Sequence, residues 1–110
     1  KIYSMAGVIN GETQMFSKPV GRGYVILETS SNHPWLENSL PINCHEFHHS
    51  KLRLKEPSYK YAYRVKRGYG IDGKHEGLIY KNLLATYNHL RDTNQTNWVD
   101  KFLSFVVKQI

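Results

Sequence analysis

The stretch Cys44-His45-Glu46-Phe47-His48-His49-Ser50 decides how the chain is interpreted, because it holds the single cysteine and three of the six histidines. In an extended strand, successive side chains point to opposite faces. The two faces are then made of His45, Phe47 and His49, and of Glu46, His48 and Ser50. The stretch is predicted to be a β-strand with one half-apolar face and one wholly polar face.

Four interpretations of this stretch are open: a metal site, a cysteine–histidine catalytic pair, a polar strand beside an active site formed by other residues, or a solvated strand. Zinc needs ligands that converge on one point. This strand divides its histidines between two faces, so no metal is expected. Cys44 and His45 are adjacent and point apart on a strand, which predicts no activating hydrogen bond between them.

Length and composition set outer limits on the fold. The chain has 110 residues, 40% hydrophobic and 13% aromatic, which is enough for one modest domain with a packed core. A single cysteine allows no internal disulfide and favours a reducing compartment, so a cytoplasmic location is expected. Neither a membrane span nor a signal peptide is predicted. Because the chain opens at Lys1, we expect residues 1–110 to be a segment of a longer polypeptide.

The net charge of +6 raises the question of a nucleic-acid partner. The densest basic stretches, residues 51–55 and 64–67, alternate with apolar residues as in strands with one solvated face. Neither a nucleic acid nor a membrane is therefore expected as a partner. The same charge suits attraction of an anionic small molecule, such as a polycarboxylate or a phosphorylated compound.

The rest of the chain has the patterns of several strands and one helix. Strands are predicted at residues 5–9, 24–29, 52–54, 59–65, 76–80 and 83–89. Loops are predicted at 30–35, with Trp35 and Leu36 anchoring the first to the core, and at 68–73. The glycines of the second loop are only a weak match to a phosphate-binding loop, because no helix pattern and no Lys-Ser/Thr follows. Pro57 is expected to end the strand through Leu54.

Apolar residues at helical spacing predict an amphipathic helix from Trp98 to the end of the chain, with Thr96 and Asn97 as cap candidates. Many strands and one terminal helix indicate a mixed sheet. His89 falls at the carboxyl end of an apolar strand, the place where open α/β sheets carry their sites.

Five motifs, in this order, resemble the carboxyl-terminal half of the glutamine amidotransferase domain of the cobyrinate a,c-diamide synthase family. They are Met5-Ala6-Gly7-Val8, Gly21-Arg22-Gly23-Tyr24, His45-Glu46-Phe47-His48-His49-Ser50, Glu76-Gly77-Leu78 and Leu84-Ala85-Thr86-Tyr87-Asn88-His89-Leu90. The resemblance covers nearly the whole chain, and the central motif is its most specific part. The chain departs from the family at Cys44, His49 and Arg91, where glycine, tyrosine and histidine are usual.

The resemblance implies an α/β fold, the second half of a class I (triad-type) amidotransferase α/β/α sandwich with a mixed, strand-rich sheet and a carboxyl-terminal helix. It implies a two-part ligase of cobalamin biosynthesis. An upstream ATPase domain, using ATP and magnesium, activates acetate side chains of a corrinoid or sirohydrochlorin-type tetrapyrrole, and the amidotransferase domain releases ammonia from glutamine. The alternative is a detached, non-catalytic amidotransferase-like module that binds a partner protein.

The family pattern places the nucleophilic cysteine in a strand-to-helix elbow upstream of this chain, so Cys44 does not match it. The segment alone is therefore expected to be inactive and to hold no cofactor. His89 matches the catalytic histidine, and the alternative for it is a core histidine bonded to the backbone. His45 and His48 are expected to have structural or interface roles.

What orients His89 is open, because Arg91 stands where many class I relatives carry a supporting glutamate. Glu46 is a chemically suitable partner, since a carboxylate bonded to an imidazole fixes its tautomer. The alternative for Glu46 is a strand residue that pairs with a basic neighbour or lines a domain interface.

Overall fold

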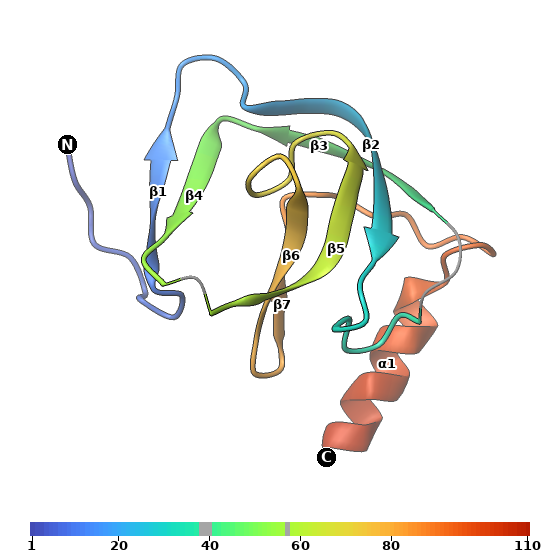
Figure 1. Ribbon diagram of the computed structural model, residues 1–110. Coiled ribbons are helices and arrows are strands. Elements are labelled where there is room, and N and C mark those ends of the chain that lie inside the picture. Colours follow the sequence, from blue (N-terminus) through green and yellow to red (C-terminus); the bar gives the residue numbers. More distant parts are fainter. Residues whose placement is uncertain (38–40, 57) are drawn as a thin grey trace.

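The computed structural model describes residues 1–37, 41–56 and 58–110 (Figure 1). Its strands are β1 (Gly11–Met15), β2 (Gly21–Thr29), β3 (Ile42–His48), β4 (Ser50–Leu54), β5 (Lys60–Arg67), β6 (His75–Tyr80) and β7 (Leu83–Ala85), and its helix is α1 (Trp98–Gln109). The predicted class, a strand-rich α/β fold with a carboxyl-terminal helix, is confirmed.

The strands form two sheets, one of five strands in the order β3-β2-β5-β6-β7 and one of two, β1-β4. Every pairing between these strands is antiparallel, where a mixed sheet had been implied. The strands β5, β6 and β7 follow one another through short connections, which suit antiparallel neighbours. Parallel neighbours need a crossover of about a dozen residues or more.

The five-stranded sheet curls until the chain beyond β7 reaches the free edge of β3 (Figure 1). An isolated antiparallel bridge joins His45 and His89 at that edge. The His89 N–H donates to the His45 carbonyl at 2.8 Å, and the His45 N–H donates to the His89 carbonyl at 3.3 Å. This closure encloses one face of β3 and leaves the other exposed.

The apolar core lies inside the curl, between β2, β3 and β5. Its buried members are Val25, Leu27, Ile42, Cys44, Ala62 and Tyr63, and Leu36 packs against them as predicted. Leu27 is fully buried. Burying one such side chain stabilises a fold by roughly 1.5–3 kcal/mol.

Residues 5–9 do not form the predicted strand. Residues 1–8 are exposed, and no strand pairs with residues 5–9 in the described part of the chain. A short apolar run forms a strand only where a neighbour satisfies its backbone groups, so apolar content alone could not decide this segment. The strand expected to end at Pro57 is β4, which ends at Leu54; Pro57 itself lies outside the described residues.

The predicted helix is confirmed, and it lies on the opposite side of the five-stranded sheet from the β1-β4 pair (Figure 1). Trp35 packs against Phe102 and Phe105 of α1, with ring centroids 5.0 and 5.2 Å apart. Asn97 occupies the cap position, although its side chain makes no capping hydrogen bond. None of the described helices is long and apolar enough to cross a membrane.

His33 holds the loop between β2 and β3. Its Nδ1 accepts hydrogen bonds from the backbone N–H groups of Trp35 (3.2 Å) and Leu36 (3.0 Å), so Nδ1 carries no proton. Its Nε2 therefore donates to the Tyr63 hydroxyl at 2.8 Å. Burial lowers the pKa of His33 to about 4, because the neutral ring is the form that fits this site.

We expect His33 to make the stability of the chain depend on pH. Unfolded, the ring binds a proton below about pH 6.5, whereas folded it does so only below about 4. Between these values the unfolded state binds more protons, so the free energy of unfolding falls as the pH drops from 6.5 to 4. His33→Phe keeps ring packing and removes this titration. Urea denaturation should show that the free energy of unfolding of the wild type falls more than that of His33→Phe between pH 7 and pH 4.5. An equal change in both proteins would contradict the assignment.

Candidate active site

The predicted strand through Ser50 breaks at His49, so that Ser50 begins β4, but the alternation of its side chains holds and the wholly polar side is the buried one. Glu46, His48 and Ser50 are 3%, 8% and 9% exposed. His45 and Phe47 are exposed on the other face. The polar face is therefore not a solvated surface, and its groups need partners inside the protein.

Glu46 receives its hydrogen bonds from the loop between β5 and β6. The backbone N–H groups of Tyr69 (2.8 Å) and Gly70 (2.9 Å) donate to its two carboxylate oxygens. Gly70 has φ +67°, a conformation that favours glycine, and a Cβ there would lie 2.7 Å from the His75 carbonyl oxygen. These two loop amides thus bind an internal carboxylate, so they do not fit a nucleotide phosphate.

His48 lies beside Glu46 on the same buried face. Its Nδ1–H donates to the Ser50 carbonyl at 3.0 Å, and its Nε2 lies 3.4 Å from Glu46 Oε2. Its ring stacks on Tyr87 at 3.9 Å between centroids, and the Tyr87 hydroxyl is 3.0 Å from the Ser50 hydroxyl. His48 therefore packs inside the fold and lies beside Glu46, while the structural or interface role expected of it stays a prediction.

A second buried carboxylate, Glu76 on β6, binds the segment that follows β7. Glu76 is 0% exposed. It accepts hydrogen bonds from the backbone N–H groups of Gly77 (2.8 Å), Tyr87 (3.2 Å) and Asn88 (3.1 Å) and from the Asn88 side-chain amide. Burial raises the pKa of Glu76, and these hydrogen bonds oppose that rise.

Asn88 connects the two carboxylates. Its side-chain N–H₂ group donates to Glu76 and, at 3.4 Å, to Glu46. Its side-chain oxygen accepts from the Cys44 thiol at 3.4 Å. Because carboxylates only accept, the orientation of this amide is fixed.

Cys44 has the environment of an inert thiol. It is 8% exposed, and burial raises its pKa to about 12, with the negative charges of Glu76 and Glu46 adding to the rise. A thiolate is the reactive form of cysteine. Its side chain also lies on the face opposite His45, which agrees with the expectation that Cys44 and His45 do not form a catalytic pair.

His89 lies on the exposed face. Its ring stacks on His45, with centroids 4.9 Å apart and planes inclined by 10°. Tyr24, 81% exposed, is the cross-strand partner of His45 on β2, so these three side chains form a row across the sheet. His89 is therefore not a core histidine. His45 stacks on His89, and the structural or interface role expected of it stays a prediction.

Glu46 does not orient His89 directly. Its partners are the loop amides, Asn88 and His48, and no hydrogen bond joins it to His89 in the described part of the chain. The reason is the alternation of the strand, because Glu46 faces inward where His45 faces outward. The sequence interpretation missed Glu76 and Asn88. Both lie in motifs that carried the resemblance, but neither has a local pattern that shows its partner.

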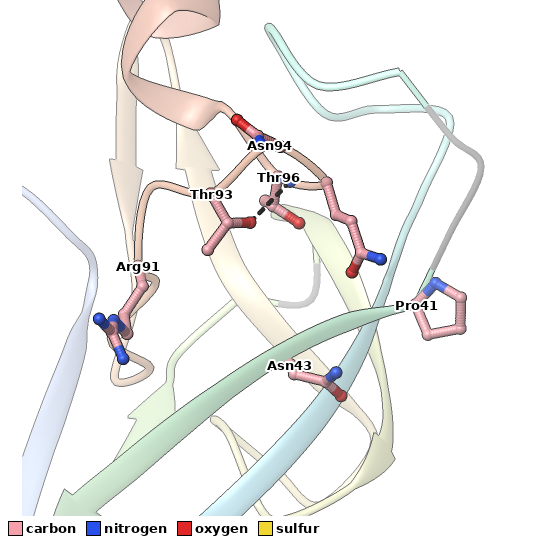
Figure 2. Close-up of a pocket in the computed structure, with 7 residues that line it drawn as sticks. Pro41, Asn43, Arg91, Thr93, Asn94 and Thr96 are labelled. Atoms are coloured by element: carbon pink, nitrogen blue, oxygen red, sulfur yellow. Dashed lines mark hydrogen bonds between the residues drawn. The ribbon is translucent and has the colours of Figure 1, made fainter.

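A pocket of about 320 Å³ lies between the start of β3 and the chain that follows His89 (Figure 2). It is lined by Pro41, Asn43, Arg91, Thr93, Asn94, Gln95 and Thr96. Asn43 is two residues from His45, and Arg91 is two residues from His89. The Thr96 N–H donates to the Thr93 hydroxyl at 3.0 Å, which shapes the loop above Asn43 (Figure 2). Its lining is polar, but the Arg91 guanidinium points away from the other labelled side chains (Figure 2).

No group of three histidine, cysteine, aspartate or glutamate side chains is placed to hold a metal ion within the described residues. The exposed histidines are the candidate acid–base groups, and no accessible thiol accompanies them among those residues.

The fold and this exposed face define the class, an α/β domain with a histidine-centred candidate site. Within that class the chain belongs to the CobB/CobQ-like glutamine amidotransferase domain family, whose model matches residues 1–96.

The chain is similar to proteins named cobyrinate a,c-diamide synthase. That of Magnetococcus marinus is 37% identical over 98 residues, which are 89% of this chain and 21% of the relative. That of Archaeoglobus fulgidus is 28% identical over 107 residues, 97% of this chain and 23% of the relative. The chain thus spans about a fifth of the length of these curated relatives. No solved structure matches it significantly.

Proposed function

We propose that residues 1–110 are the carboxyl-terminal part of the glutamine amidotransferase domain of a cobyrinate a,c-diamide synthase. That enzyme amidates acetate side chains of cobyrinate or a related tetrapyrrole, with ammonia taken from glutamine, in cobalamin-type cofactor biosynthesis. The observation that carries the proposal is His89, which lies within the matched region and presents an exposed ring that a thiol outside this chain can approach.

The chemistry needs a thiolate and a histidine. The thiolate attacks the carboxamide carbon of glutamine, the C–N bond breaks, and a thioester remains that water hydrolyses to glutamate. The histidine takes the thiol proton and returns it to the departing nitrogen, which leaves as ammonia. We assign the histidine role to His89 and the thiol to a cysteine upstream of Lys1, because Cys44 is buried with a raised pKa.

ATP with magnesium would activate the acceptor carboxyl group in an upstream ATPase domain. The glycine-containing loop at residues 68–73 does not fit a nucleotide phosphate, because the amides of Tyr69 and Gly70 are already bonded to Glu46. A cytoplasmic location is part of the proposal, supported by a buried free cysteine that suits a reducing compartment.

We expect the isolated 110-residue chain to release no glutamate from glutamine, because its thiol is enclosed beside two carboxylates. The measurement is glutamate release with and without added thiol-alkylating reagent. Activity that disappears in Cys44→Ser would overturn the assignment of the nucleophile. A parent reading frame without an upstream cysteine elbow and a nucleotide-binding loop would instead favour a detached module that binds a partner protein.

A further inference from the structure

The segment that carries His89 is held from inside the fold by one carboxylate. Glu76 accepts the backbone N–H groups of Tyr87 and Asn88, the two residues directly before His89. Glu76 is wholly buried and belongs to β6, a central strand. Hydrogen bonds to an ionised acceptor in such a place are strong, because water does not compete for the donors.

The Asn88 side chain joins the same segment to a second carboxylate, Glu46. It is 5% exposed, and its amide spans from Glu76 to Glu46 while its oxygen accepts the Cys44 thiol. Every polar atom of this side chain therefore has a partner. No other rotation of the side chain would give each carboxylate a donor.

Asn88 is buried and His89, the next residue, is exposed, so the bend at residues 87 and 88 sends the two side chains to opposite sides of the chain. The paired backbone hydrogen bonds with His45 then set the distance from β3. The stack of the two imidazoles at 4.9 Å follows from that register. The exposed ring thus takes its place from buried residues, at a site where Arg91 and not an acid follows two positions later.

We propose that Glu76, acting through the Tyr87–Asn88 segment, and Asn88 are positioning residues for His89. This rests on the proposed function, in which His89 serves the glutamine half-reaction. Neither residue touches the reacting atoms; both hold the backbone that aims the ring. A displacement of about 1 Å at a reacting group can cost about 100-fold in rate, so these residues set how fast glutamine is used.

The test uses the full-length protein with cobyrinate, ATP and magnesium, and compares the amidation rate with glutamine to that with ammonium chloride. Glu76→Gln keeps the volume but places an N–H₂ group against N–H donors. Asn88→Ala removes the bridging amide and leaves the Glu76 bonds to the backbone. Trp35→Ala is a matched destabilised control, because it loosens the packing of α1 and touches neither residue. Thermal unfolding is recorded for each variant.

We expect the glutamine rate of both variants to fall about 10- to 100-fold, with the ammonia rate near that of wild type. Trp35→Ala should lower both rates together. If the ratio of the glutamine rate to the ammonia rate stays at the wild-type value in Asn88→Ala and Glu76→Gln, the positioning role is overturned. If Glu76→Gln does not fold, the ratio in Asn88→Ala alone decides the test. His89→Ala, measured in parallel, separates the two proposals. If it spares the glutamine rate, the proposed function itself falls, and the positioning role falls with it.

Discussion

Replacement of His89 by alanine in the full-length protein is expected to lower glutamine-dependent amidation by about 10²–10⁴-fold, the usual contribution of general acid–base catalysis. Without the imidazole, the thiol lacks its base and the departing nitrogen lacks its proton donor. The ring lies on the surface and, among the described residues, stacks on His45 alone, so its removal should leave none of their buried groups without a partner. The fold should therefore survive, and the loss should be chemical.

Ammonia supplied directly should still be incorporated by His89→Ala, because carboxyl activation in the proposed enzyme would need no glutamine. The measurement is a pair of rates, one with glutamine and one with ammonium. Trp98→Ala is the control for instability, and it should lower both rates together. Since Trp98 is only half-buried, its cost should be below the 3–5 kcal/mol typical of a buried aromatic ring. Equal loss of both rates in a well-folded His89→Ala protein would withdraw the catalytic assignment.

The alternation of side chains along β3 could be predicted from its sequence. Which of its two faces is buried could not. Alternation placed Glu46 and His48 on one face and His45 on the other, and the structure confirms this division. Which face is buried depends on the curl of the sheet, and the curl is set by pairings as distant as His45 with His89. A local period of two carries no information on such a contact.

The partners of the two buried carboxylates could not be predicted from neighbouring residues either, because they too are distant in the sequence. Glu46 binds amides at residues 69 and 70, and Glu76 binds amides at 87 and 88. The sequence predicted a loop at 68–73 and a strand at 83–89, but β7 ends at Ala85, so residues 87 and 88 lie beyond the strand. In either kind of segment a backbone amide has no side-chain pattern that marks it as a donor. The direct pairing of Glu46 with His89, although chemically sensible, was therefore wrong in geometry. The real connection runs through Asn88.

Glu46→Ala is expected to be among the most destabilising single changes in this chain. It removes the acceptor of the backbone amides of Tyr69 and Gly70, and one of the two acceptors of the Asn88 side-chain amide. Each such donor costs about 1–3 kcal/mol, and losing one member of a buried charged network typically costs about 3–5 kcal/mol in total. We expect a loss of that order in the free energy of unfolding, measured by urea denaturation of the 110-residue chain.

Glu28→Ala is the matched control, because it removes the same side chain from the same sheet. Glu28 pairs with Arg64 at 3.4 Å and Lys66 at 3.6 Å, both more than half exposed. Exposed ion pairs contribute only about 0–1 kcal/mol each, since water and salt screen them. Glu28→Ala should therefore lower the free energy of unfolding less than Glu46→Ala, although Glu28 has two cationic partners. Hydrogen exchange should localise the difference, with the Tyr69 and Gly70 amides losing protection in Glu46→Ala alone. If both variants unfold with equal ease, the buried carboxylate does not hold the loop, and the interior network would not be the source of the geometry at His89.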